Sequence, residues 1–291
     1  MIRGSTFLER NFVLLVISIN LVVLLTVVVW PVFYVVNASF YDIQLGVPRE
    51  FVGFKNYTKI FHDHFFWEYL WHSIVYTVGS LSVSLIVSMI LGICLNGIDK
   101  LKGLWRASIL MPWAIPVAVS ALIWRLILND QIGIVNGILL RLGILHQPQA
   151  WLGHPASAMI SVILADSWTR IPLITILLLA GLQGIPTELY EAAKIDGAGG
   201  ISRFRYVTLP LISSTIRVTL IIVGIFIFRT YTLIGVLTTG GPGDSTQVFT
   251  TYIYQTGVVY LDIGYSSALS VVMFTIVIFI SLSYRSSSRT S

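Results

Sequence analysis

The chain has 291 residues, of which 56% are hydrophobic and only 11% are charged. A soluble globular protein carries about 25% charged residues, so an ordinary soluble domain is excluded. A mean hydropathy of +0.85 and a net charge of +5 indicate a polytopic membrane protein whose basic residues orient the chain rather than bind nucleic acid. The single cysteine, Cys94, excludes an internal disulfide bond and a cysteine-based metal cage.

Charge-free stretches predict six membrane-spanning helices. A spanning helix needs about 20 largely apolar residues, and no charge lies between Arg10 and Asp42 or between Glu68 and Asp99. The six predicted spans cover about residues 12–36, 70–96, 107–128, 156–182, 211–237 and 263–284. We therefore expect an all-α membrane protein with a single transmembrane domain over residues 1–291.

Two of these spans carry further signals. The apolar run of residues 12–36 is too long for a cleaved signal peptide, and no small-residue cleavage site follows Trp30-Pro31. We interpret it as a retained span. Pro112 and Pro116 are expected to kink the third span, because proline removes a backbone hydrogen bond from a helix.

The distribution of Lys and Arg predicts that both termini lie in the cytoplasm, with the chain in the cell membrane. In that orientation the cytoplasmic segments hold ten basic residues: Arg3, Arg10, Lys100, Lys102, Arg106, Lys194, Arg203, Arg205, Arg285 and Arg289. The outer segments hold five: Arg49, Lys55, Lys59, Arg125 and Arg141. The last outer loop, residues 238–263, contains no Lys or Arg.

Two outer segments are expected to do more than connect spans. Residues 37–69 are rich in aromatic side chains, which suits a segment at the level of the lipid headgroups. Residues 132–144 have the pattern of a short amphipathic helix lying on the outer surface.

The cytoplasmic loop 183–210 is predicted to form a helix–turn–helix on the membrane face. Thr187 can cap the first helix, with Glu188 and Glu191 in its first turn, where the helix dipole favours carboxylates. An apolar stripe follows: Leu189, Ala192, Ala193 and Ile195. Gly197 ends this helix, because glycine tolerates a left-handed conformation. A short basic helix with Arg203 and Arg205 comes next, and Pro210 marks the start of the fifth span.

This loop resembles a known motif. Glu191-Ala192-Ala193, Asp196-Gly197-Ala198, Phe204 and Leu209-Pro210 fit the EAA loop of permease subunits in binding-protein-dependent ABC importers. The resemblance implies a type I ABC importer permease fold. It also implies that these residues, together with Glu188, form a coupling helix that docks in a cleft of a separate ATP-hydrolysing subunit.

A second resemblance, over about residues 10–285, is to the carbohydrate-uptake group, of the larger maltose permease and glycerol-phosphate permease type. It is carried by Leu237-Thr-Thr-Gly-Gly241-Pro242, Ser245-Thr246, Tyr252-Ile-Tyr254 and Gly264-Tyr265-Ser-Ser-Ala268. It implies a second related permease, two ATP-binding subunits and an extracytoplasmic sugar-binding protein as partners. Gly240, Gly241 and Pro242 would form a tight turn that shapes the outer mouth of the pathway.

Charged residues inside spans are functional candidates, because burying them in a membrane is costly. Asp166 and Arg170 lie four residues apart on one helix face and can pair, either structurally or functionally. The family's sugar-cavity positions fall here on the following residues: Thr169, Arg170, Leu173, Val223, Phe226, Ile227 and Thr230. The last four share one helical face, a periodicity that equally describes a packing stripe.

Several alternatives remain open at this point. Arg170 and Arg229 favour an anionic ligand, so an acidic sugar or sugar phosphate diester competes with a neutral saccharide. An ion-coupled secondary carrier could use Asp166 and Arg170 as a relay, and an intramembrane enzyme would need a carboxylate or histidine pair. We expect no metal at His62, His64 and His72. The sequence has no P-loop, so we expect a non-enzymatic permease whose ATP and Mg²⁺ are bound by the partner subunits.

Overall fold

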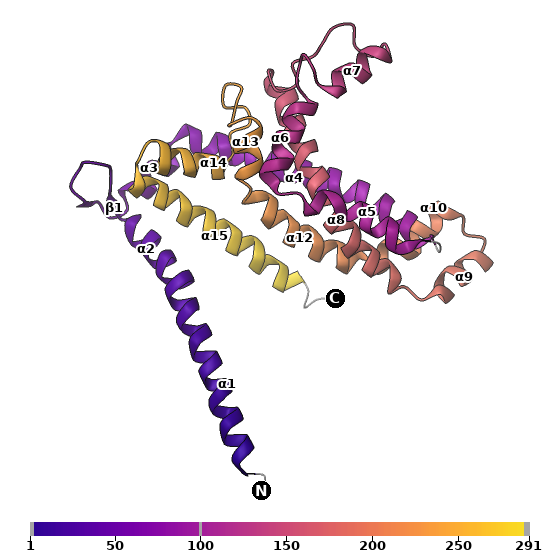
Figure 1. Ribbon diagram of the computed structural model, residues 1–291, viewed down its shortest axis with the longest axis horizontal. Coiled ribbons are helices and arrows are strands. Elements are labelled where there is room, and N and C mark those ends of the chain that lie inside the picture. The colour runs from indigo at the N-terminus through magenta and orange to yellow at the C-terminus, as the bar shows by residue number, and fades with distance from the viewer. Residues whose placement is uncertain (1–2, 99–100, 288–291) are drawn as a thin grey trace. The chain divides into compact units, whose positions relative to one another are not determined.

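The computed structural model describes residues 3–98 and 101–287, almost entirely as helices (Figure 1). Lys100 and Arg289, two of the residues counted for the cytoplasmic side, lie outside the described residues. The chain divides into two compact units, Met1–His64 with Ile253–Ile278 and Phe65–Tyr252 with Phe279–Ser291.

The first unit begins with one long apolar helix. Its three consecutive parts are α1 (Arg3–Val23), the π-helical η1 (Leu24–Val29) and α2 (Trp30–Ala38). Over Asn11–Ala38 this helix satisfies the length and composition of a membrane span, and none of its most apolar window is buried within the protein. Its apolar surface is therefore available to lipid or to another subunit.

A small polar substructure follows the long helix. Strands β1 (Tyr41–Asp42) and β2 (Glu50–Phe51) pair antiparallel, and α3 (Lys55–His62) comes next. The buried Asn56 amide donates hydrogen bonds to the carbonyls of Ser39 and Tyr41, at 2.9 and 3.0 Å. The unit is completed by η3 (Gln255–Val259) and by the part of the long helix α15 (Ile263–Ser287) that ends at Ile278.

In the second unit, α4 (His64–Asn96) and α8 (Pro155–Gln183) pack through small side chains. The buried face of α4 carries serines at helical spacing: Ser73, Ser80, Ser84 and Ser88. Ser88 Oγ donates to the Ile171 carbonyl at 3.0 Å, and Ser167 Oγ on α8 donates to the Ser80 carbonyl at 3.3 Å. Small residues allow such close approach of backbones, which is how helices associate in membranes.

Six further helices of this unit precede or follow α8. They are α5 (Lys102–Ala114), α6 (Val117–Ile127), α7 (Ile134–Arg141), α12 (Ser213–Phe228), α13 (Thr232–Leu237) and α14 (Phe249–Tyr254), whose last two residues belong to the first unit. Helices α5 and α12 both pack against α8 (Figure 1). The predicted surface helix of residues 132–144 is present as the shorter α7.

The predicted third span is two helices at a sharp angle and not one kinked helix. α5 and α6 meet at 91° across Ile115 and Pro116. Ile115 is extended, with φ −80° and ψ 129°, because the residue before a proline avoids the helical region. Pro112 lies inside α5 without breaking it. Of the two expected kink sites, only Pro116 therefore breaks the helix.

The predicted fifth span, residues 211–237, is not one helix. α12 begins at Ser213 and ends at Phe228, and α13 follows after a break. In the described part of the chain, four helices are long and apolar enough to cross a membrane, and the number reaches six when each of the two bent pairs counts as one span. The second bent pair is Gly200–Leu211 with Ser213–Phe228, at 65°.

Candidate functional site

The first half of the loop 183–210 forms α9 (Thr187–Ile195), which follows α8 after three residues. Gly197 has φ +78°, the left-handed conformation expected of it. Its N–H donates to the Lys194 carbonyl at 3.0 Å, and the Ala198 N–H donates to the Ala193 carbonyl at 2.9 Å. This pair of hydrogen bonds is a Schellman motif, which favours glycine at the left-handed position.

The start of α9 differs from the prediction. Pro186, with ψ 134°, supplies the non-helical residue before the first turn, so Thr187 is already helical and makes no capping hydrogen bond. Of the two glutamates expected in the first turn, only Glu188 lies there. The predicted capping role of Thr187 and the first-turn position of Glu191 were therefore wrong.

Helix α9 leaves most of its surface open. The following predicted docking residues are exposed: Glu188, Glu191, Ala192, Asp196 and Gly197. Ala193 and Ala198 are half-buried. Two apolar side chains are also exposed, Leu189 by 42% and Ile195 by 86%. The predicted apolar stripe is thus not buried against the rest of the described chain, and carboxylates and apolar groups share one free surface.

The second half of the loop is longer than predicted. α10 (Gly200–Arg203), η2 (Phe204–Thr208) and α11 (Leu209–Leu211) follow one another without a gap. Phe204 is half-buried, whereas Leu209 and Pro210 are exposed. The Tyr190 and Thr208 hydroxyls lie 3.0 Å apart and link α9 to η2. The fifth span begins at Ser213, beyond a bend at Ile212, and not at Pro210.

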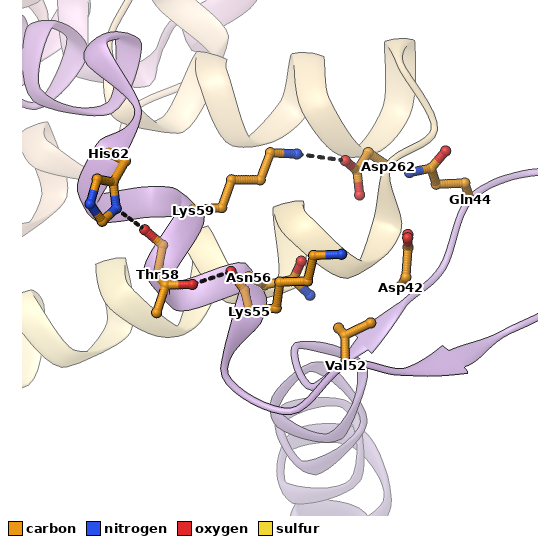
Figure 2. Close-up of a pocket in the computed structure, with 9 residues that line it drawn as sticks. All are labelled: Asp42, Gln44, Val52, Lys55, Asn56, Thr58, Lys59, His62 and Asp262. Atoms are coloured by element: carbon orange, nitrogen blue, oxygen red, sulfur yellow. Dashed lines mark hydrogen bonds and ion pairs between the residues drawn. The ribbon is translucent and has the colours of Figure 1, made fainter.

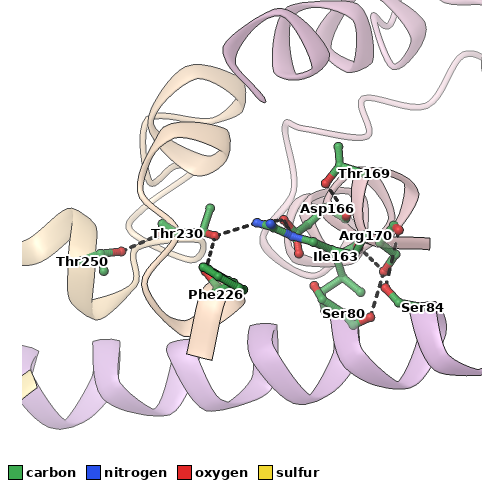
Figure 3. A network of polar contacts seen from close by, with 10 residues as sticks. Ser80, Ser84, Ile163, Asp166, Thr169, Arg170, Phe226, Thr230 and Thr250 are labelled. Atoms are coloured by element: carbon green, nitrogen blue, oxygen red, sulfur yellow. Dashed lines mark hydrogen bonds and ion pairs between the residues drawn. The ribbon is translucent and has the colours of Figure 1, made fainter. Parts of the chain in front are cut away.

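The predicted intramembrane ion pair is present. Arg170 Nη2 lies 3.1 Å from Asp166 Oδ1, and Arg170 Nε donates to the same oxygen at 3.2 Å (Figure 3). The Asp166 side chain is fully buried, and that of Arg170 is 19% exposed. A buried charge is tolerated when it is paired in this way.

Thr230 joins this pair to two other segments. Arg170 Nη2 donates to Thr230 Oγ1 at 3.0 Å, and Thr230 Oγ1 donates to the Phe226 carbonyl at 3.0 Å (Figure 3). Thr250 Oγ1 on α14 donates to the Thr230 carbonyl at 2.8 Å. The break between α12 and α13 is therefore held to both α8 and α14 by one residue.

The other predicted cavity positions have different environments. Val223 and Ile227 are fully buried in the hydrophobic core of the second unit, whereas Phe226 is 52% exposed. Thr169 is buried and donates to the Asp166 carbonyl at 2.7 Å, and Leu173 is partly buried against the core. Val223 and Ile227 thus have the environment of a packing stripe, while Arg170 and Thr230 form the polar part of the predicted set.

The predicted turn at Gly240, Gly241 and Pro242 is tightly braced. Gly240 has φ +90°, and the Gly241-Pro242 peptide bond is cis. Thr246 N–H donates to the Gly240 carbonyl at 3.0 Å, and Thr246 Oγ1 donates to the Gly241 carbonyl at 2.8 Å. A Cβ at Gly240 would overlap the Gln247 side chain. The turn therefore requires glycine at this position.

A polar pocket of about 390 Å³ lies in the first unit, and the sequence did not reveal it (Figure 2). Lys59 forms an ion pair with Asp262 at 3.5 Å and lies 4.1 Å from the centre of the Tyr265 ring. Asp42 and Lys55 also line the pocket. Lys55 and Lys59 both come from α3, and their spacing of four residues places them on one helix face, which was the signal available in the sequence.

The histidines do not gather around a metal position. His62 Nδ1 lies 2.8 Å from the Thr58 carbonyl, and His72 Nδ1 lies 3.0 Å from the Gln247 carbonyl. Among the described residues, no group of three or more His, Cys, Asp or Glu side chains is arranged to hold a metal ion.

The chain matches the family described as binding-protein-dependent transport system inner membrane component over residues 84–290, and it belongs to that family. It is 37% identical over 270 residues to the sulfoquinovosyl glycerol transport system permease protein SmoG of Agrobacterium fabrum, covering 92% of this chain and 87% of SmoG. It is also 37% identical to the trehalose/maltose transport system permease protein MalF of Thermococcus litoralis, covering 90% of this chain and 89% of that protein.

Solved structures show the same fold. A permease chain of a bacterial ABC transporter involved in the import of the acidic polysaccharide alginate superposes with a TM-score of 0.78 at 23% identity, covering 97% of this chain and 98% of that one. A second structure, of the alginate transporter with an alginate pentasaccharide-bound periplasmic protein, superposes with a TM-score of 0.76 at 22% identity, covering 96% of each chain. The predicted family and all-α importer permease fold are confirmed. The chain is a membrane-embedded permease subunit and not an enzyme.

Proposed function

We propose that this permease imports a saccharide or saccharide derivative, driven by ATP hydrolysis on two partner subunits that bind ATP and Mg²⁺. A second related permease would complete the membrane pathway, and an extracytoplasmic binding protein would deliver the sugar. Both termini would lie in the cytoplasm. In this assembly the exposed surface of α9 docks on an ATP-binding subunit.

The open surface of α9 is the observation that carries this proposal. A helix that keeps Leu189 and Ile195 exposed beside Glu188 and Glu191 is suited to a partner with an apolar and basic cleft. α9 is stiffened at its end by the hydrogen bonds of Gly197 and Ala198. Three residues connect α9 to α8, and the continuous helical segments α10, η2 and α11 lie between α9 and α12, so a displacement of α9 is passed to both helices as a rigid-body motion.

The charge of Arg170 does not by itself select an acidic substrate, because Asp166 lies 3.1 Å from it and compensates that charge. Arg229, the second arginine predicted to favour an anion, is exposed. SmoG is named for the transport of sulfoquinovosyl glycerol, a sugar derivative with an anionic sulfonate, and MalF for that of neutral trehalose or maltose, so these relatives support a saccharide of modest size, neutral or acidic. An ion-coupled carrier finds no support, because the family consists of binding-protein-dependent systems.

The test is transport by the reconstituted complex carrying Glu191→Lys or Gly197→Asp. Both variants should insert and assemble in the membrane, yet uptake of the sugar should fall at least about tenfold, because reversing a charge in a docking surface costs on the order of 1.4 kcal/mol or more. ATP hydrolysis should no longer respond to the loaded binding protein.

Matched controls separate docking from folding. Glu50→Lys reverses an exposed glutamate in β2, and Gly199→Ala adds a Cβ in open space at an ordinary φ of −67°. Both controls should transport at the normal rate. Normal transport by Glu191→Lys and Gly197→Asp would refute the coupling role of α9.

A further inference from the structure

A second cavity, of about 320 Å³, lies behind the coupling helix in the second unit. Its polar lining comes from Asn96, Tyr190, Arg203 and Thr208, and Leu182 and Phe204 contribute apolar walls. Its size falls at the small end of the range of about 300–1,000 Å³ for ligand pockets. The cavity lies on the side of α9 that faces η2, as the contact between the Tyr190 and Thr208 hydroxyls shows.

Arg203 is the feature that indicates a ligand. Its Nε is buried and has no hydrogen-bond partner in the described part of the chain. None of the described residues that line this cavity is acidic, and Arg203 is the only charged residue among them. A guanidinium stays protonated in proteins, and a buried donor without a partner is unfavourable. An anion with two or more oxygens would satisfy it, because guanidinium groups bind carboxylates and phosphates with paired hydrogen bonds.

The neighbouring groups favour phosphate over a carboxylate. The amide of Asn96 offers further donors in the same cavity, and the hydroxyls of Tyr190 and Thr208, which lie 3.0 Å apart, can donate to an anion by exchanging one of their present partners. A phosphate group has more acceptor oxygens than a carboxylate and can use all of them. Leu182 and Phe204 would contact the carbon atoms next to the phosphate.

The position of the cavity fits a lipid phosphate. Asn96 is the last residue of α4, and Leu182 lies one residue before the end of α8, so the cavity is at the ends of two candidate spans. Headgroup phosphates lie at that level of a bilayer. Lys194 and Arg205, on the same loop, are exposed and add positive charge near its surface.

We propose that this cavity, around Arg203, binds a phosphate group, carried either by an anionic phospholipid or by a soluble phosphate compound. The bound phosphate joins Arg203 of α10 to Tyr190 of α9 and stiffens the loop. Any effect on transport rests on the proposed coupling role of α9, whereas phosphate binding does not.

Binding is tested on the purified transporter in nanodiscs. Native mass spectrometry counts retained lipids after exchange into phosphatidylcholine containing a graded fraction of phosphatidylglycerol, and a parallel arm adds inorganic phosphate. Arg203→Gln should weaken retention of phosphatidylglycerol at least about tenfold, as expected for losing a charge-assisted hydrogen bond. Retention of phosphatidylglycerol by Arg203→Lys should lie between that of Arg203→Gln and that of the unchanged protein, because lysine keeps the charge but not the paired donors.

The control is Arg205→Gln, which removes an exposed arginine two residues away. It lowers the charge of the loop by the same one unit outside the cavity, so it should retain phosphatidylglycerol far better than Arg203→Gln does. Competition by inorganic phosphate would identify the soluble source, and its absence the lipid source. Equal retention by Arg203→Gln, Tyr190→Phe and the unchanged protein in both arms would overturn the proposal even if α9 proves to couple transport to ATP hydrolysis.

Discussion

The ion pair of Asp166 and Arg170 gives a prediction whose magnitude can be worked out from the structure. Arg170→Met leaves the fully buried Asp166 carboxylate without its cation. Breaking a buried pair from one side costs about 3–5 kcal/mol. The lost hydrogen bond to Thr230 adds only about 0.6 kcal/mol, the average between helices in a membrane. The unpaired charge therefore dominates, and the free energy of unfolding should fall by several kcal/mol.

A double-mutant cycle isolates this effect. Asp166→Asn should cost less than Arg170→Met, because the remaining Arg170 side chain is 19% exposed and keeps Thr230 as a partner. The double variant has no unpaired charge and should lose about 1 kcal/mol, the worth of its missing hydrogen bonds. The two changes should therefore be less than additive by at least about 2 kcal/mol.

The assay is thermal or denaturant unfolding of the purified transporter, followed by the fraction that stays monodisperse. Arg217→Met serves as the matched control, because Arg217 is an exposed arginine of α12, and it should behave like the unchanged protein. Additive losses, or a double variant as unstable as Arg170→Met alone, would refute the argument that charge pairing holds these helices together.

Two further predictions concern packing. Gly240→Ala should lower the free energy of unfolding by about 1–2 kcal/mol or more, because a left-handed non-glycine residue is unfavourable and its Cβ would overlap Gln247. The control Gly243→Ala, also at positive φ but with open space around the Cβ, should lower the free energy of unfolding by less in the same assay. Ser88→Leu should cost about 1–3 kcal/mol by overpacking the contact of α4 with α8, whereas Ile86→Leu, at a residue that is 61% exposed, should be neutral. Equal losses in either matched pair would contradict these predictions.

Features with a local cause could be predicted from the sequence. Gly197 was expected to end a helix because few other residues adopt its conformation, and the structure gives it φ +78°. The pairing of Asp166 with Arg170 followed from their spacing of four residues in an apolar stretch. The span boundaries that depend on charge, such as the end of α4 near Asn96, were also close.

Features that depend on tertiary contacts could not be predicted in the same way. The helix break at residues 229–231 falls on Arg-Thr-Tyr, with no glycine or proline between Ile225 and Ile234, and it is stabilised by partners from α8 and α14 that are distant in the sequence. Pro112 and Pro116 look alike in the sequence, but only Pro116 breaks the helix. The contact of α4 with α8 is different, because the serines of α4 recur at helical spacing and this spacing predicts a close helix contact.

The hydrogen bonds of Thr230 limit how the substrate selectivity of this transporter can be changed by mutation. Its hydroxyl and carbonyl hold Arg170, Phe226 and Thr250, so three segments of the second unit meet at one small residue. Thr230 is also one of the residues that we predict to face the sugar. A library that randomises it to alter selectivity will therefore alter the mechanical link between helices as well, and Thr230→Ser is the substitution that keeps the link while changing the shape of the site.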